Sequence, residues 1–437
     1  MKHIYAIIVA ILLGCIVPFV LILNKGMLLL AIPFIVILLV FVQIKKKIIK
    51  PEYFLFFLLA STAIPHSIIS AGIKVSFSDI YLIVGFVLLL IVNKFKFNFP
   101  KTYFLIAITY VFLSALSLVW ADEYTKGVSR LFQYFEFMII TVFVFYNIKT
   151  TYYRKMLNWY VFISTILGII AIIFYITQGG QGPVYMLGFH KNALGTVLGT
   201  SISLIVGLYL LSRQEQPGGK KIYLLCLIIN MVGLVMSMSR GALIGSIAAI
   251  FILLFFMGKT KQIFVLIPLF AICISLYLYL APSYLERATA FDKFSSAYSR
   301  VTIYNDAVEK IKEHPLIGEG VGNYFIEIPM IHFSQDDPNN VFLLNLVELG
   351  LIGLVIFIVL LLCIFIYAIT NKRKHKYNYE IRTMNAIFIS GFVARLVHIQ
   401  VDVSWVRGIG IFMFAMVGML LALRKIDRID KPNKSAN

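Results

Sequence analysis

The chain has 437 residues, of which 60% are hydrophobic and only 14% are charged. Together with a mean hydropathy of +0.91, this composition excludes an ordinary soluble domain and predicts a polytopic helical membrane protein. The net charge of +19 would suggest nucleic acid in a soluble protein. Here the basic residues lie in short loops between apolar runs, so membrane topology explains them and no nucleic-acid partner is expected.

Apolar runs recur along the whole chain, and about 20 apolar residues are needed for one helix to span a membrane. We expect an all-α transmembrane bundle of about 14 spans that forms one membrane domain over residues 1–437. The candidate spans are 4–23, 27–44, 53–69, 80–92, 102–119, 131–146, 157–177, 193–211, 222–238, 241–257, 262–280, 341–369, 384–399 and 405–423. The four cysteines lie in apolar runs, so neither disulfides nor a metal site is expected.

The distribution of basic residues predicts the orientation of these spans. If the N-terminus is cytoplasmic, the inside segments hold 26 of the 39 basic residues. Each inside loop is basic with scarcely any acid, whereas the outside turns 70–79 and 178–191 hold one base apiece. The positive-inside rule therefore predicts that both termini are cytoplasmic and that the long polar segment 281–340 is extracytoplasmic.

Segment 281–340, between the eleventh and twelfth predicted spans, is the one long non-apolar stretch. It holds nine of the 20 acidic residues of the chain. Val301, Tyr304, Val308 and Ile311 recur at helical spacing, which predicts a short amphipathic helix that ends at His314 and the following proline. We therefore expect this large loop to fold against the mouth of the bundle rather than to serve as a plain connection.

Two predicted outer turns combine basic and small polar residues. His190, Lys191 and Asn192 precede the eighth span, where Asn192 could also simply cap the helix and Lys191 could extend to the interface. Arg240 lies in the sequence Ser-Met-Ser-Arg-Gly between the ninth and tenth spans. An arginine there is often an interface anchor, but serines and free helix N–H groups beside it also suit a phosphate.

Further charged and polar residues lie in or near the large loop and the C-terminal spans. Arg300 opens the amphipathic helix, and Glu348 falls within the twelfth span, where a carboxylate is costly unless it is paired. Arg395, His398 and Asp402 are spaced by three and four residues and so share one helix face. For these three we favour a structural ion-pair network over a direct catalytic role, and both readings stay open.

The order of these motifs resembles the O-antigen ligase and O-antigen polymerase superfamily of bacterial membrane glycosyltransferases. The resemblance covers residues 187–353 and rests on five short motifs. They are Ser-Met-Ser-Arg-Gly-Ala at 237–242, Tyr-Ser-Arg at 298–300, His-Pro-Leu-Ile-Gly-Glu-Gly-Val-Gly-Asn-Tyr-Phe at 314–325, Asn-Asn-Val-Phe-Leu at 339–343 and Glu-Leu-Gly-Leu-Ile-Gly at 348–353. His190, Lys191 and Asn192 also resemble a loop found at the matching place.

The resemblance implies a metal-independent glycosyltransferase without a cofactor, in which Arg240 and Arg300 hold the diphosphate of a polyprenyl-diphosphate-linked glycan. It adds a substrate-binding set of His190, Lys191, Asn192, His314, Asn339 and Asn340. Relatives are expected to carry their general base as the histidine of a His-Asn pair, but here that place holds Asn339, which cannot accept a proton. The candidate bases are therefore Glu319, Asp336, Asp337 and His332, with His314 next.

The leading hypothesis is extracytoplasmic polymerisation of a cell-surface polysaccharide, such as a capsule or exopolysaccharide. The alternatives are a ligase that transfers the finished glycan to a lipid, protein or wall acceptor, and a flippase of the lipid-linked glycan. The predicted partners are the lipid-linked donor, a glycan acceptor and the bilayer of the bacterial cytoplasmic membrane, with a flippase and a chain-length regulator as further candidates. Internal repeats and midplane charges are typical of transporters, and the sequence has neither.

Overall fold

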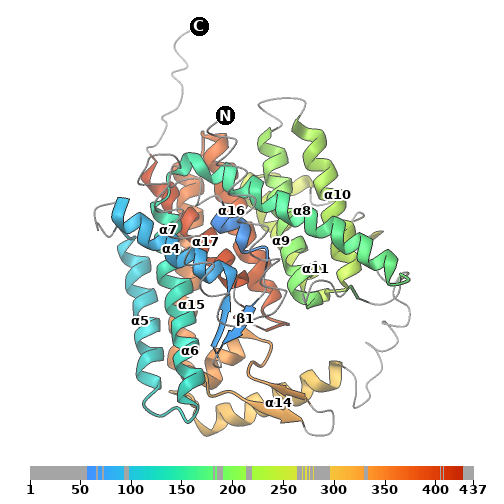
Figure 1. Cartoon of the computed structure of the whole chain (residues 1–437). Helices are drawn as coiled ribbons and strands as arrows, with labels where there is room; N and C mark the ends of the chain where they lie inside the picture. The colour runs from blue at the N-terminus through green and yellow to red at the C-terminus, as the bar shows by residue number, and fades with distance from the viewer. Residues whose placement is uncertain are drawn as a thin grey trace.

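A computed structural model describes most of the chain, and its helices pack into one bundle (Figure 1). The described residues are 57–64, 67–70, 73–92, 98–180, 183–184, 190–212, 219–262, 268, 271–272, 275, 279, 296–328, 333–403, 405–406 and 408–426. The first two predicted spans lie outside these residues, as do part of the third and most of the eleventh.

Apolar helices follow the predicted spans in the described residues, except that the predicted span 53–69 is wrong at its end, where residues 67–70 form a strand. They are α4 (Phe77–Val92), α5 (Lys101–Ser117), α6 (Tyr124–Phe135), α7 (Val142–Asn147), α8 (Tyr153–Thr177), α9 (Lys191–Ser212), α10 (Gly219–Ser237), α11 (Arg240–Met257), α15 (Val341–Lys374), α16 (Tyr379–His398) and α17 (Ile409–Ala422). A π-helical stretch η1 (Glu136–Thr141) joins α6 to α7 without a break, and short 3-10 turns form η2 (Thr150–Tyr152), η3 (Thr260–Gln262) and η5 (Leu423–Lys425).

Six helical segments among the described residues are long and apolar enough to cross a membrane. They are Tyr124–Asn147, Thr150–Thr177, Lys191–Ser212, Lys220–Ser237, Arg240–Met257 and Val341–Lys374. The chain is therefore a multi-pass helical membrane protein, as its composition predicted. The count of about fourteen spans and the orientation of the bundle stay predictions.

Among the described residues, two short antiparallel strand pairs accompany the helices, and the all-α prediction did not include them. Strand β1 (Ser67–Ser70) pairs antiparallel with β2 (Ile73–Ser76), and β3 (Ile326–Ile328) pairs antiparallel with β4 (Phe333–Gln335). Strands of three or four residues are too short for an alternating pattern to stand out in a sequence. The main prediction of a helical membrane protein holds.

The predicted amphipathic helix is present as α14 (Ser296–Glu313), which crosses one end of the bundle (Figure 1). Ile303 and Ala307 are buried on its inner face, whereas Val301 and Val308 are exposed. The helix ends one residue before His314 and Pro315, because proline disfavours helical geometry in the residue that precedes it. The segment before α15 therefore folds over this end of the bundle.

Three helices approach one another closely through small residues. A Cβ atom on Gly241 would lie 2.7 Å from His398 Cδ2, and one on Gly245 would lie 2.5 Å from the Ala394 carbonyl oxygen. Where α9 meets α11, a Cβ on Gly199 of α9 would lie 2.9 Å from the Ala242 carbonyl oxygen. Glycines spaced by four residues let membrane helices pack backbone to backbone, and here they bring α9, α11 and α16 together.

The glycine-rich turn after α14 inserts into a break in α15. Gly350 has a φ of +63°, which interrupts the helix and leaves the carbonyls of Val347 and Glu348 without their helical partners. The N–H groups of Glu319 and Gly320 donate to those two carbonyls at 2.8 and 3.0 Å. N–H groups of the turn thus bond the carbonyls that the kink leaves free, and these hydrogen bonds hold the polar segment on the bundle.

Candidate functional site

A cavity of about 320 Å³ opens at the α14 end of the bundle. Five elements that are far apart in the sequence contribute to its walls: the start of α9, the α10–α11 turn, α14, the segment before α15 and the end of α16. Its lining residues are His190, Lys191, Asn192, Met238, Ser239, Arg240, Gly241, Ser299, Arg300, Ile303, Gln335, Asn339, His398, Val401, Asp402 and Val403. Most of these side chains are polar or charged, which sets the cavity apart from the apolar core.

The α10–α11 turn presents Arg240 to the cavity. Met238 has a φ of +51°, a left-handed conformation that is strained for a long side chain and often marks a functional turn. Ser239 caps α11 by accepting a hydrogen bond from the Ala242 N–H at 3.4 Å. Arg240 is therefore the first residue of α11, where the free N–H groups and the helix dipole also favour an anion.

Arg300 reaches the same cavity from the first turns of α14. Its Nη2 donates to the Val401 carbonyl oxygen at 3.2 Å, and Ser299 beside it also lines the wall. This bond ties α14 to the segment after α16 and uses one of the five N–H donors of the guanidinium. Two guanidinium groups, Arg240 and Arg300, thus line one cavity.

The two asparagines before α15 have different environments. Asn339 lines the cavity with a φ of +57°, which asparagine tolerates, and its N–H donates to Asp337 Oδ1 at 2.8 Å. Asn340 instead caps α15, where its Oδ1 accepts from the Phe342 and Leu343 N–H groups at 2.9 and 3.1 Å. Asn340 is not among the residues that line the cavity.

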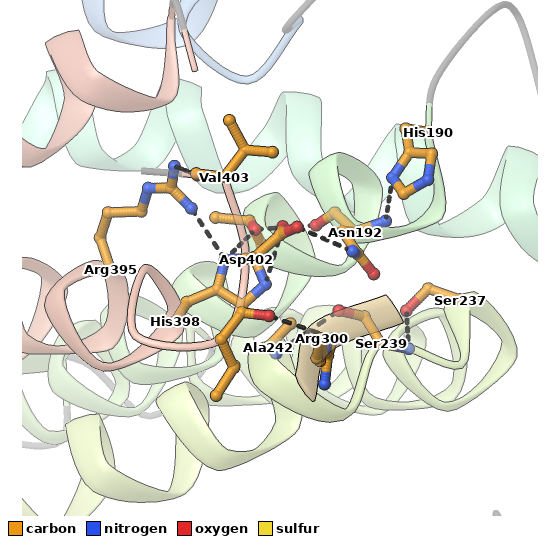
Figure 2. A network of polar contacts seen from close by, with 12 residues as sticks. His190, Asn192, Ser237, Ser239, Ala242, Arg300, Arg395, His398, Asp402 and Val403 are labelled. Carbon is orange, nitrogen blue, oxygen red and sulfur yellow. Dashed lines mark hydrogen bonds and ion pairs between the residues drawn. The ribbon is translucent and has the colours of Figure 1, made fainter. Parts of the chain in front are cut away.

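A chain of polar contacts joins α16 to the start of α9 across one wall (Figure 2). Arg395 Nη1 lies 2.8 Å from His398 Nδ1, and His398 Nε2 lies 3.4 Å from Asp402 Oδ2. Asn192 Nδ2 donates to the other oxygen, Asp402 Oδ1, at 2.9 Å, and the Asn192 N–H lies 3.3 Å from His190 Nδ1. Both oxygens of the Asp402 carboxylate therefore face nitrogen groups.

His190 and Lys191 add basic groups at the rim where α9 begins. Loss of surrounding water lowers the pKa of His190; Asp402 raises it and Lys191 lowers it again. Because desolvation dominates, the imidazole is neutral at physiological pH, while the Lys191 ammonium adds positive charge beside it. The cavity therefore combines three positive side chains, Lys191, Arg240 and Arg300, with the carboxylate of Asp402.

The other predicted candidates lie outside the cavity lining. Glu319 Oε2 lies 3.9 Å from Lys310 Nζ, and burial raises the pKa of Glu319 more than this ammonium lowers it. His314 is exposed at the end of α14. His332 lies outside the residues that the structure describes. The roles proposed for these three side chains stay predictions.

Asp336 and Asp337 meet a buried arginine that the sequence did not single out. Arg130 of α6 donates from Nη2 to the Asp336 carbonyl at 3.1 Å, and its Nη1 lies 3.9 Å from Asp337 Oδ2. Its Nε lies 4.0 Å from Glu348 Oε1, while Tyr134 donates to Glu348 Oε2 at 3.1 Å. Glu348 is thus paired, as the cost of a membrane carboxylate predicted.

Six predicted site residues come together in the cavity: His190, Lys191, Asn192, Arg240, Arg300 and Asn339. Sequence reasoning left Asp402 and His398 out of the candidate site, although their spacing by four residues was a usable signal. The prediction that Asp402 shares a helix face with Arg395 and His398 is wrong, because α16 ends at His398 and Asp402 lies in the segment after it. Sequence reasoning noted Ser239 only as one of the serines beside Arg240, and it had no signal for Gln335, which only the fold brings to the wall. The arrangement suits an anion such as a phosphate or diphosphate, because guanidinium groups bind phosphate oxygens bidentately.

Comparison with known proteins gives one family match. Residues 224–358 match the model of a protein family described as O-antigen ligase, and the match runs from α10 into α15. It contains Arg240, Arg300 and Asn339, whereas residues 190–192 and Asp402 lie outside it. No curated protein matches the chain. Together with the multi-pass helical fold, this matched region, which covers about a third of the chain, supports membership of the O-antigen ligase superfamily.

Proposed function

We propose that this chain polymerises a bacterial cell-surface polysaccharide by transferring glycan from a polyprenyl diphosphate carrier to a growing glycan acceptor. The observation that carries the proposal is that Arg240 and Arg300, from separate elements, line one cavity. Two separate arginines at one space are costly to assemble unless an anion binds there. The match of residues 224–358 to the O-antigen ligase family supports the class of reaction.

The chemistry is a displacement at the anomeric carbon of the donor sugar. An acceptor hydroxyl forms the new C–O bond, the bond to the diphosphate breaks, and its electron pair leaves on the diphosphate oxygen. Arg240, Arg300 and Lys191 would neutralise the charge that develops on this leaving group. Charge-assisted hydrogen bonds from guanidinium to phosphate are among the strongest available for that task.

We place the cavity on the outer side of the cytoplasmic membrane. The bundle end where α15 finishes and α16 begins carries Lys372, Arg373, Lys374, Lys376 and Arg382, and the positive-inside rule assigns such loops to the cytoplasm. α15 runs from the cavity end at Val341 to this basic end at Lys374. A site facing outward suits surface polymerisation, because the lipid-linked repeat units are consumed there.

The proposal is tested with Arg240→Ala and Arg300→Ala in a deletion strain that carries the chain on a plasmid. Each variant should abolish long polymer and accumulate lipid-linked single repeat units, at normal protein level in the membrane. Arg373→Ala is the matched control, since it removes an exposed arginine at the opposite end of α15. Normal polymer length in both cavity variants would refute the proposal.

The same deletion strain separates the alternatives. A polymerase defect leaves single repeat units on the carrier at the outer leaflet. A ligase defect leaves full-length chains on the carrier, and a flippase defect leaves single units on the inner leaflet, where an added non-permeant glycosidase cannot reach them. Each result is scored by gel separation of the lipid-linked glycan before and after the glycosidase.

A further inference from the structure

Asp402 occupies the wall of the cavity that Arg240 and Arg300 also line. Its side chain is 15% exposed, so the carboxylate can be reached from the cavity while it is held from behind. Asn192 Nδ2 donates to Oδ1 at 2.9 Å, and His398 Nε2 lies 3.4 Å from Oδ2 (Figure 2). One hydrogen bond from Asn192 and a close contact with His398 therefore fix the position of a carboxylate that the cavity can still reach.

The hydrogen bonds of His398 determine which of the two groups can accept a proton. A guanidinium only donates, so the contact of 2.8 Å from Arg395 Nη1 makes His398 Nδ1 an acceptor. The proton of the neutral ring is then on Nε2, which faces Asp402 Oδ2. His398 therefore cannot take another proton at the cavity without becoming a buried cation beside Arg395, whereas Asp402 keeps free lone pairs.

We propose that Asp402 is the general base of the glycosyl transfer, an inference that rests on the proposed function. The acceptor hydroxyl gives its proton to the Asp402 carboxylate while its oxygen bonds to the anomeric carbon of the donor. The bond from that carbon to the diphosphate breaks, and the electron pair leaves with the diphosphate. Asp402 then returns the proton to water in the open cavity, so the carboxylate is restored after each transfer.

Asp402 can supply the general base that Asn339, at the expected place of the histidine, cannot. Asn339 lines the same cavity, but its amide cannot accept the proton of a hydroxyl. The carboxylates of Glu319, Asp336 and Asp337 are not among the residues that line the cavity. Among the described lining residues, Asp402 is the one carboxylate, and it reaches the space from the segment that follows α16 rather than from the large loop.

His398 and Asn192 act as positioning residues in this arrangement. Thr196 Oγ1 lies 2.8 Å from His398 Nδ1 and 2.8 Å from the Asn192 carbonyl oxygen, so a single α9 side chain contacts both partners of Asp402. The charged and titratable groups that face Asp402 come from four elements. They are Arg395 and His398 on α16, His190 and Lys191 at the start of α9, Arg240 on α11 and Arg300 on α14.

The test compares Asp402→Asn with wild type in two measurements on full-length protein purified in detergent. The first is single-turnover transfer with the lipid-linked repeat units extracted from a deletion strain. The second is the Kd of inorganic diphosphate from calorimetry. We expect transfer to fall by at least about 100-fold, as is typical when a general base is removed. Diphosphate should bind equally well or more tightly, because the substitution removes a negative charge from a cavity that holds two arginines.

Two further variants keep the test independent of folding. Asp402→Glu should regain part of the transfer rate, and the exposed Asp122→Asn is the matched control that should equal wild type. Should Asp402→Asn transfer at the wild-type rate while Arg240→Ala is inactive, Asp402 is not the base and the proposed function stands. Should both be fully active, the proposed function fails. Loss of transfer together with loss of diphosphate binding in Asp402→Asn would also overturn the inference, because the side chain would then be structural.

Discussion

Replacement of Arg130 by glutamine is expected to destabilise the protein strongly. Arg130 is 10% exposed, and its guanidinium lies 3.9 Å from Asp337 and 4.0 Å from Glu348, whose side chains are 0% and 1% exposed. Removing one partner of a buried ion pair costs about 3–5 kcal/mol, because the remaining charge stays buried without compensation. The hydrogen bond to the Asp336 carbonyl is lost as well. We therefore expect the free energy of unfolding to fall by about 3–5 kcal/mol.

The measurement is equilibrium unfolding by SDS titration in mixed micelles. Arg130→Gln combined with Glu348→Gln should recover at least about 1 kcal/mol relative to Arg130→Gln alone. The reason is that the double variant no longer buries the Glu348 carboxylate without its arginine partner. The exposed pair Lys126–Glu123 is the matched control: its atoms lie closer, at 3.5 Å, but the side chains are 43% and 54% exposed. Lys126→Gln should therefore cost less than about 1 kcal/mol.

This perturbation also reaches the cavity. Asp337 accepts the N–H of Asn339, which lines the cavity, so Arg130 holds that wall through the Asp337 carboxylate. Arg130→Gln should reduce transfer along with stability. If Arg130→Gln unfolds within about 0.5 kcal/mol of wild type, the buried cluster does not hold the polar segment on the bundle and the reasoning is wrong.

Three smaller predictions concern packing, capping and pH. Gly241→Leu should abolish transfer and cost about 1–3 kcal/mol in SDS titration, because the new side chain would overlap His398. Asn340→Ala should cost about 1 kcal/mol in the same titration through loss of the α15 cap, and Asn340→Ser should restore it. The pKa of Glu319 is raised by burial despite Lys310, so the stability linked to its protonated form is lost as pH rises through that raised pKa. As the pH rises from about 5 to about 8, the melting temperature of Glu319→Gln should therefore increase relative to that of wild type. A difference in melting temperature that is equal at all pH values would contradict this.

Much of the fold could be predicted from apolar runs and their ends. A membrane-crossing helix satisfies its own backbone hydrogen bonds, so its extent depends on local hydrophobicity alone. The predicted spans 157–177, 193–211 and 241–257 accordingly lie within α8, α9 and α11. The amphipathic spacing of Val301 to Ile311 likewise located α14, because a 3.6-residue period is a local property of the chain.

Part of the candidate site could be predicted for a similar reason. Arg240 and Arg300 stood out because charge at the end of an apolar helix or beside a turn is unusual in so hydrophobic a chain. Asp402 carried a weaker signal. Its spacing from His398 fits an ordinary ion pair as well as a site, and nothing in the local sequence distinguishes the two.

By itself, the amino-acid sequence determined the membrane class, the positions of most described helices and the charged groups available for chemistry. Only the tertiary structure decided which of those groups share a space. It brings Asn192, Arg240, Arg300 and Asp402 to one cavity through glycine contacts among α9, α11 and α16 and through the polar segment that fills the kink of α15. The physical reason is that helix formation is local, whereas the meeting of side chains about 200 residues apart depends on close packing between helices whose partners no local pattern specifies.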